Sequence, residues 1–109
     1  MFYNVADLKR FEEQPKSLKV HLGDNAMFAC DIKGSPKPTV RWYKEEREIV
    51  ESENINYRLH QDGVLEISNV QFADLGRYKC KAESVDKSRT SEVATLIQND
   101  DLGKYLFVS

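Results

Sequence analysis

The chain has 109 residues and a mass of 12.6 kDa, a length typical of one domain. Hydrophobic residues make up 40% and charged residues 31%, and no apolar run approaches the roughly 20 residues of a spanning helix, so a disordered or membrane-spanning chain is excluded. The net charge of −2, from 16 Lys+Arg against 18 Asp+Glu, excludes a nucleic-acid binder that depends on bulk positive charge.

Alternation of apolar and polar residues predicts strands from the start of the regular region. Residues 18–22 and 26–32 form two such strands on either side of a turn at Gly23-Asp24. The segment 34–38 predicts a loop, because its two prolines cannot donate to a ladder. The inward face of the second strand carries Ala26, Phe28, Cys30 and Ile32.

The second half continues the same period. Short strands are predicted at Ile49-Val50, at 57–60 and around Leu65, and a last one covers about 91–98. Between them, Tyr78, Cys80 and Ala82 alternate with three basic residues. Seven or eight short strands separated by turn residues indicate an antiparallel sandwich or barrel.

The two cysteines constrain the compartment. Cys30 and Cys80 lie fifty positions apart on inward parities, which fits one long-range disulfide joining two facing sheets and contributing about 4 kcal/mol. A pair of buried free thiols is the alternative. The bridge favours an oxidising, extracellular setting. The start, Met1-Phe2-Tyr3-Asn4, lacks the basic and apolar parts of a secretory signal, which indicates a cytosolic protein or an excised part of a longer one.

Further residues complete a recognisable pattern. Trp42 follows Cys30 by twelve positions on the inward side, and Tyr78 precedes Cys80 by two, after Asp74-Leu75-Gly76. The set of cysteine, tryptophan, tyrosine corner and cysteine is typical of immunoglobulin domains. The chain resembles an intermediate-set immunoglobulin domain over residues 11–98. The resemblance implies an all-β, immunoglobulin-like antiparallel sandwich with one disulfide, and a core signature of Trp42, Leu65, Asp74 and Tyr78.

The residues near the two ends of the chain make the family resemblance more specific. Residues 5–11 resemble the end of one such domain running into the next, and residues 88–94 with 99–107 resemble the same junction one domain later. The arrangement is similar to the second immunoglobulin domain of netrin receptors of the deleted-in-colorectal-cancer, neogenin and frazzled family. It divides the chain into a linker or first strand (1–10), the domain (11–98), and a linker with the start of a following domain (99–109).

That resemblance implies a function. The domain would be a non-catalytic interaction and spacer module in the extracellular part of a single-pass plasma-membrane receptor for axon guidance or cell adhesion. Its implied partners are adjacent immunoglobulin domains and a protein ligand or co-receptor. The competing hypothesis is a structural repeat of an intracellular muscle filament protein, which suits free thiols and the absence of any Asn-x-Ser/Thr sequon.

One position departs from the family pattern. Many members carry an arginine, paired with the aspartate of the Asp-x-Gly motif, where this chain has Asn56. Asp74 is therefore expected to use either Arg58, two residues on, or a plain hydrogen bond.

A row of cations is the candidate binding feature. Three basic residues point outward from one predicted strand, one from its neighbour, and two lie in the following loop: Arg77, Lys79, Lys81, Arg41, Lys87 and Arg89. The hypothesis is a basic face for an acidic partner, either heparan sulfate or an acidic protein surface. The alternative is neutralisation by the acidic residues of the adjacent edge, Glu45, Glu46, Glu48, Glu51 and Glu53.

No catalytic, metal or cofactor site is predicted. His21 and His60 fall at polar strand positions, and two cysteines with two histidines show no metal-ligand spacing. No nucleophile, base and orienting group are brought together by the pattern, so no enzyme is predicted.

Overall fold

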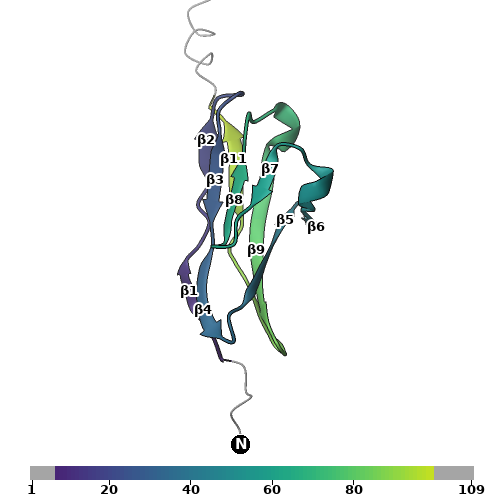
Figure 1. The fold of residues 1–109 in the computed structure, drawn as a ribbon. Coiled ribbons are helices and arrows are strands. Elements are labelled where there is room, and N and C mark those ends of the chain that lie inside the picture. The colour runs from purple at the N-terminus through teal and green to yellow at the C-terminus, as the bar shows by residue number, and fades with distance from the viewer. Residues whose placement is uncertain (1–6, 100–109) are drawn as a thin grey trace, which may run out of the picture.

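The fold consists of two packed layers of strands (Figure 1), seen in a computed structural model that describes residues 7–99. In these residues the helical elements are two single turns of 3₁₀ helix, η1 (Glu51–Glu53) and η2 (Phe72–Asp74). The predicted all-β, immunoglobulin-like sandwich is confirmed.

One layer is made of two short sheets. The first pairs β1 (Asp7–Glu13) with β4 (Asp31–Ser35), and the second has the order β3 (Ala26–Ala29), β8 (Val64–Ile67), β7 (Tyr57–Leu59). All of these pairs are antiparallel.

The other layer is a larger sheet centred on the long strand β9 (Gly76–Ser84). Its order is β2 (Leu18–Val20), β11 (Ala94–Gln98), β9, β5 (Thr39–Lys44), β6 (Arg47–Glu48), and β10 (Lys87–Thr90) also pairs with β9. The pair of β2 and β11 is parallel.

The core lies between the layers, where strands such as β3, β8 and β9 bury alternate residues. Cys30 and Cys80 form the predicted disulfide, with their Cα atoms 6.6 Å apart, and Trp42 lies directly opposite Cys80 in the β5–β9 register. The ring of Phe28 packs between Trp42 and Tyr78, at centroid distances of 6.3 and 5.0 Å. Each such buried side chain contributes roughly 1.5–3 kcal/mol of hydrophobic stabilisation.

A hydrogen-bonded carboxylate stands where the family's usual ion pair would be. Buried Asp74 accepts hydrogen bonds from the Tyr57 hydroxyl (2.9 Å), from Asn56 Nδ2 (3.1 Å) and from the backbone N–H of Gln71 (2.8 Å). Arg58 is exposed and does not take part. Of the two expectations for Asp74, the structure shows the plain hydrogen bond.

The hydroxyl groups of Tyr57 and Tyr78 contact each other and Asp74. The Tyr78 hydroxyl contacts the Asp74 backbone carbonyl and lies 2.7 Å from the Tyr57 hydroxyl. Because each hydroxyl has a single proton, the two protons can supply two of these three contacts at a time, and donation by both tyrosines to Asp74 leaves no proton between the two hydroxyl oxygens. Burial raises the pKa of Tyr57 far above its ordinary value, assisted by the contacts with Tyr78 and Asp74. Burial also raises the pKa of Tyr78.

Several predicted boundaries were wrong. The strand expected at 18–22 ends at Val20, and the strand expected at 26–32 is divided at Cys30 into β3 and β4, which belong to different sheets. The strand expected at 91–98 begins only at Ala94, as β11. Ahead of it, the buried Ser91 bonds the backbone through its hydroxyl, which accepts from Cys80 N at 2.9 Å and donates to the Glu92 carbonyl at 2.8 Å. The edge strand expected at 49–50 lies at 47–48, since a two-residue turn reverses the chain earlier. The loop expected at 34–38 begins later, because Gly34 and Ser35 extend β4 along β1.

The predicted division into a linker or first strand (1–10), the domain (11–98) and a following linker (99–109) stays a prediction. β1 begins at Asp7 and pairs with β4, within the range 1–10 assigned to a linker or first strand. Of the range 99–109, residues 100–109 lie outside the described residues.

Candidate functional site

The predicted row of cations lies on the outer face of the larger sheet. Arg77, Lys79 and Lys81 alternate along β9 with the buried Tyr78, Cys80 and Ala82. Arg41 on β5 is directly opposite Lys81. Paired residues share one face of a sheet, so these four side chains do form one surface, as expected.

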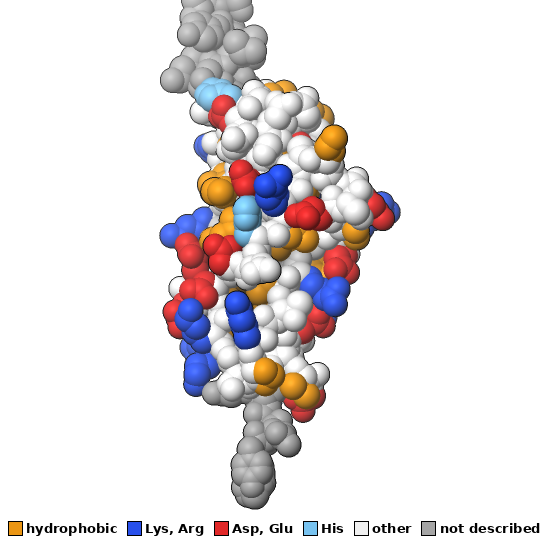
Figure 2. All heavy atoms as spheres, viewed as in Figure 1, with side chains coloured by type: hydrophobic (Ala, Val, Ile, Leu, Met, Phe, Trp, Pro, Cys, Tyr) orange, Lys and Arg blue, Asp and Glu red, His pale blue; other side chains and the backbone are white. Residues whose placement is uncertain are grey.

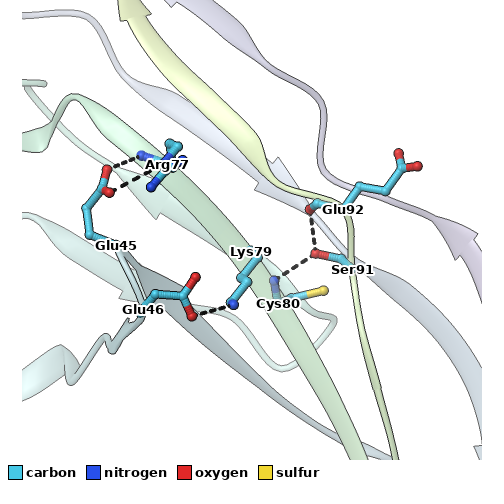
Figure 3. A network of polar contacts seen from close by, with 7 residues as sticks. All are labelled: Glu45, Glu46, Arg77, Lys79, Cys80, Ser91 and Glu92. Atoms are coloured by element: carbon cyan, nitrogen blue, oxygen red, sulfur yellow. Dashed lines mark hydrogen bonds and ion pairs between the residues drawn. The ribbon is translucent and has the colours of Figure 1, made fainter.

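Three of the four cations form ion pairs with glutamates. Arg41 binds Glu48 and Glu83, each at 2.9 Å, and Lys79 Nζ lies 2.6 Å from Glu46 Oε1. Arg77 Nε lies 3.4 Å from Glu45 Oε1 (Figure 3). Each ion pair has at least one exposed partner, and surface pairs of this kind contribute little to stability. Together they balance the charge of the row: four cations (Arg41, Arg77, Lys79, Lys81) face four anions (Glu45, Glu46, Glu48, Glu83).

The turn between β5 and β6 places two of these glutamates. Glu45 and Glu46 both have positive φ, 48° and 69°, the conformation that a two-residue hairpin turn requires. Contacts to β9 hold this turn: Glu45 N donates to the Arg77 carbonyl at 3.0 Å, and Glu45 Oε2 accepts from Arg77 N at 2.7 Å. The hydrogen bond from the Arg77 amide is the main cause of the lowered pKa of Glu45.

Arg41 has the densest set of partners in the row. Its hydrogen bonds and charge interactions with Glu48 and then Glu83 raise its pKa further. Glu83 was missed by the sequence reasoning, which looked for neutralising residues only on the adjacent edge. The signal was available, because Glu83 has the same parity on β9 as Lys81 and is therefore a diagonal neighbour of Arg41.

Lys81 is the exception in the row. Among residues 7–99 it has no anionic partner, although it lies directly opposite the like charge of Arg41 on one side. On its other side it faces Thr90 of β10. Among the four cations of the row, Lys81 is thus the one left for an external anion.

The prediction that Lys87 and Arg89 lie in a loop is wrong, because both residues lie in β10. They lie opposite Ser84 and Ala82, both of which are buried. The two cations therefore have the inner parity, away from the row, and Arg89 Nε donates to the Leu8 carbonyl of β1 at 3.3 Å. The structure does not bring all six predicted cations together. On the side shown in Figure 2, basic and acidic side chains are interspersed.

The described residues have an open surface groove with a histidine at its margin, and they have no grouped metal ligands. An open groove of about 830 Å³ runs between β4, the start of β5 and the turn at 60–64. His60, at its margin, binds Glu66 at 2.9 Å. Within the described residues no three His, Cys, Asp or Glu side chains are grouped as metal ligands, and no helix there has the length and apolar character needed to span a membrane.

Comparison with known proteins shows the family to which this chain is similar. Residues 9–98 match the model of the immunoglobulin I-set domain. Roundabout homolog 1 of Mus musculus is 37% identical over 93 residues, 84% of this chain and 6% of the relative. Netrin receptor DCC of Homo sapiens is 32% identical over 91 residues, 83% of this chain and 6% of the relative. The chain thus spans about one-sixteenth of the length of these curated relatives.

A solved structure of a titin domain has a similar fold. The atomic resolution structure of titin domain M7 superposes with a TM-score of 0.77 at 25% identity, covering 87% of this chain and 97% of that one. Since a netrin receptor is among the relatives and Roundabout homolog 1 is more similar to this chain, the likeness to a netrin receptor's second domain stays a prediction. The disulfide between facing sheets, the tryptophan beside it and the family match agree, and the chain belongs to the immunoglobulin I-set family.

Proposed function

We propose that this domain is a non-catalytic interaction and spacer module in the extracellular part of a multidomain, single-pass plasma-membrane receptor of the axon-guidance or cell-adhesion class. The Cys30–Cys80 disulfide carries the proposal, because such bridges persist in oxidising compartments and are rare in the cytosol. The relatives Roundabout homolog 1 and netrin receptor DCC support it. The finer assignment is to the second immunoglobulin domain of a netrin-type receptor.

The spacing function follows from the arrangement of the ends. The described chain enters at β1 and leaves beyond β11, where Asn99 N still donates to the Val20 carbonyl at 2.7 Å. Figure 1 shows these two ends at opposite poles of the sandwich. A disulfide-joined unit of this shape holds adjacent immunoglobulin domains, its proposed neighbours within the same chain, at a fixed separation.

The proposed external partners are a protein ligand or co-receptor and, for the cations without a carboxylate partner, heparan sulfate. Lys81 and Lys87 have no anionic partner among the described residues, and Arg89 donates to a backbone carbonyl. Retention on a heparin column tests this. The variant K81A/K87A/R89A should elute at clearly lower salt than the unmodified domain, whereas R41A/R77A/K79A, which loses cations already bound to glutamates, should change elution less. Equal losses in both variants would reject the assignment.

The muscle-filament hypothesis is supported by the similarity to titin domain M7 and by the muscle M-line assembly protein unc-89 of Caenorhabditis elegans, which is 36% identical over 76 residues. The two functions differ in compartment, so the redox state of the cysteines in native tissue separates them. Alkylation before and after reduction, followed by mass spectrometry of the peptides that contain Cys30 and Cys80, should find them blocked as a disulfide. Free thiols at both positions would reject the receptor assignment and favour the filament.

A further inference from the structure

The outer edge of β7 is built differently from an ordinary free strand edge. β7 is the terminal strand of its sheet (Figure 1). His60 N donates to the Val64 carbonyl and Ser68 N to the Asn56 carbonyl, both at 2.9 Å. Since bonded and non-bonded pairs alternate in an antiparallel ladder, the backbone groups of Tyr57 and Leu59 point away from β8, toward solvent.

Both outward N–H groups of this edge are already occupied. Tyr57 N donates to the Asn54 carbonyl at 3.1 Å, a bond fixed within the backbone. Leu59 N donates to Glu51 Oε2 at 2.6 Å, so a side chain from η1 takes the place of a neighbouring strand. An exposed glutamate can rotate away and free the amide, which a backbone acceptor cannot do.

The space beside this edge suits an extended chain. A groove of about 490 Å³ runs along β7, and the side chain of Ile55, fully exposed, stands at its margin. Glu51 and Glu53 make the η1 side acidic. The cation of β7 itself, Arg58, lies opposite Glu66 in the register with β8.

We propose that the outer edge of β7 receives an extended, lysine- or arginine-bearing segment of a partner protein by strand addition. The segment's carbonyl accepts the N–H of Leu59, and the displaced Glu51 carboxylate pairs with the segment's cation. Main-chain hydrogen bonds supply affinity in this kind of recognition and alternate side chains supply specificity. Glu51 thereby closes the edge to indiscriminate pairing and selects for a basic strand. This inference goes beyond the proposed function and holds in either compartment.

The test uses the ¹⁵N-labelled domain and two eight-residue probes, one alternating valine with lysine and one alternating valine with glutamate. The lysine peptide should shift the amide resonances of residues 57–59, most of all Leu59, and the glutamate peptide should not. E51Q should weaken binding of the lysine peptide about fivefold, the size expected for losing one partly desolvated ion pair. E53Q is the matched control, because it removes the same charge from the same turn but no bond to β7, and it should weaken binding less than twofold.

Four outcomes would overturn the proposal: equal binding of both peptides, no binding of the lysine peptide at millimolar concentration, shifts centred outside residues 51–61, or equal effects of E51Q and E53Q. A dependence of the Leu59 resonance on protein concentration without peptide would assign the edge to a second copy of this chain and also reject the proposal. The peptide comparison on the unmodified domain does not depend on how any variant folds.

Discussion

Removing the Tyr57 hydroxyl should expose how this domain stabilises a buried aspartate without an arginine. In Tyr57→Phe, Asp74 loses one of its three donors, the hydroxyl at 2.9 Å, and keeps Asn56 Nδ2 and Gln71 N. A hydrogen bond to a charged group contributes about 1.5–3 kcal/mol. We therefore expect a loss of about 2 kcal/mol in the free energy of unfolding, which lowers the melting temperature by roughly 10 °C for a domain of this size.

The assay is urea and thermal unfolding followed by circular dichroism at pH 7, with Tyr43→Phe as the control. Tyr43 is half-buried on the outer face, and its hydroxyl has no hydrogen bond within the described residues, so its variant should lose less than about 0.5 kcal/mol. A Tyr57→Phe variant as stable as Tyr43→Phe would refute the view that the tyrosine hydroxyl replaces the family's arginine.

The same network predicts a dependence on alkaline pH. The pKa values of Tyr57 and Tyr78 are raised in the folded state, so folding holds their protons while the unfolded chain ionises near its ordinary value of about 10. The stability they contribute is therefore present below pH 10 and is lost as the pH rises above it. Absorbance of tyrosinate at 295 nm should show two of the five tyrosines ionising only as the domain unfolds. Ionisation of all five before unfolding would contradict the assignment.

The remaining predictions concern the turn, the bridge and the ion pairs. Gly63→Ala should lower the free energy of unfolding by more than about 4 kcal/mol or prevent folding, because its Cβ would lie 2.2 Å from the Cys30 carbonyl oxygen. Gly23→Ala is also at positive φ, but its Cβ would lie 3.8 Å from the nearest atom, so it should lower the free energy of unfolding by only about 1–2 kcal/mol. Similar urea midpoints for the two variants would refute this difference. Replacing both cysteines with alanine should lower the free energy of unfolding by about 4 kcal/mol, and a loss below 1 kcal/mol would show that the bridge is dispensable. The pKa of Glu45 is lowered from 4.5 in the folded state, so its contribution to folding stability is present above pH 4.5 and is lost as the pH falls further. Glu45→Gln should therefore make the free energy of unfolding depend less on pH on the acid side, and an unchanged dependence would exclude this role.

The sequence predicted the inward residues well because burial imposes a strict period of two. Cys30, Trp42, Leu65 and Tyr78 are all buried, and a one-residue slip would move each to the opposite face. Strand ends were less predictable. The last strand begins at Ala94 rather than at Ser91. The Ser91 hydroxyl bonds the backbone of Cys80 and Glu92 instead, and no alternation of apolar residues carries that information.

The candidate site shows a different limit of prediction. Parity correctly placed four cations on one face, but the charge of a face depends on which residues lie diagonally across the ladder. That depends on register, and register is set by the turn: because Glu45 and Glu46 form a two-residue turn, Glu48 is brought opposite Tyr43 and within 2.9 Å of Arg41. A turn one residue longer would move Glu48 out of that position and leave Arg41 with Glu83. The binding character of this surface is therefore decided by the backbone conformation of two glutamates. Their turn supplies carboxylates to Arg77 and Lys79 and brings Glu48 to Arg41, and the cation of the row that remains for a partner is Lys81.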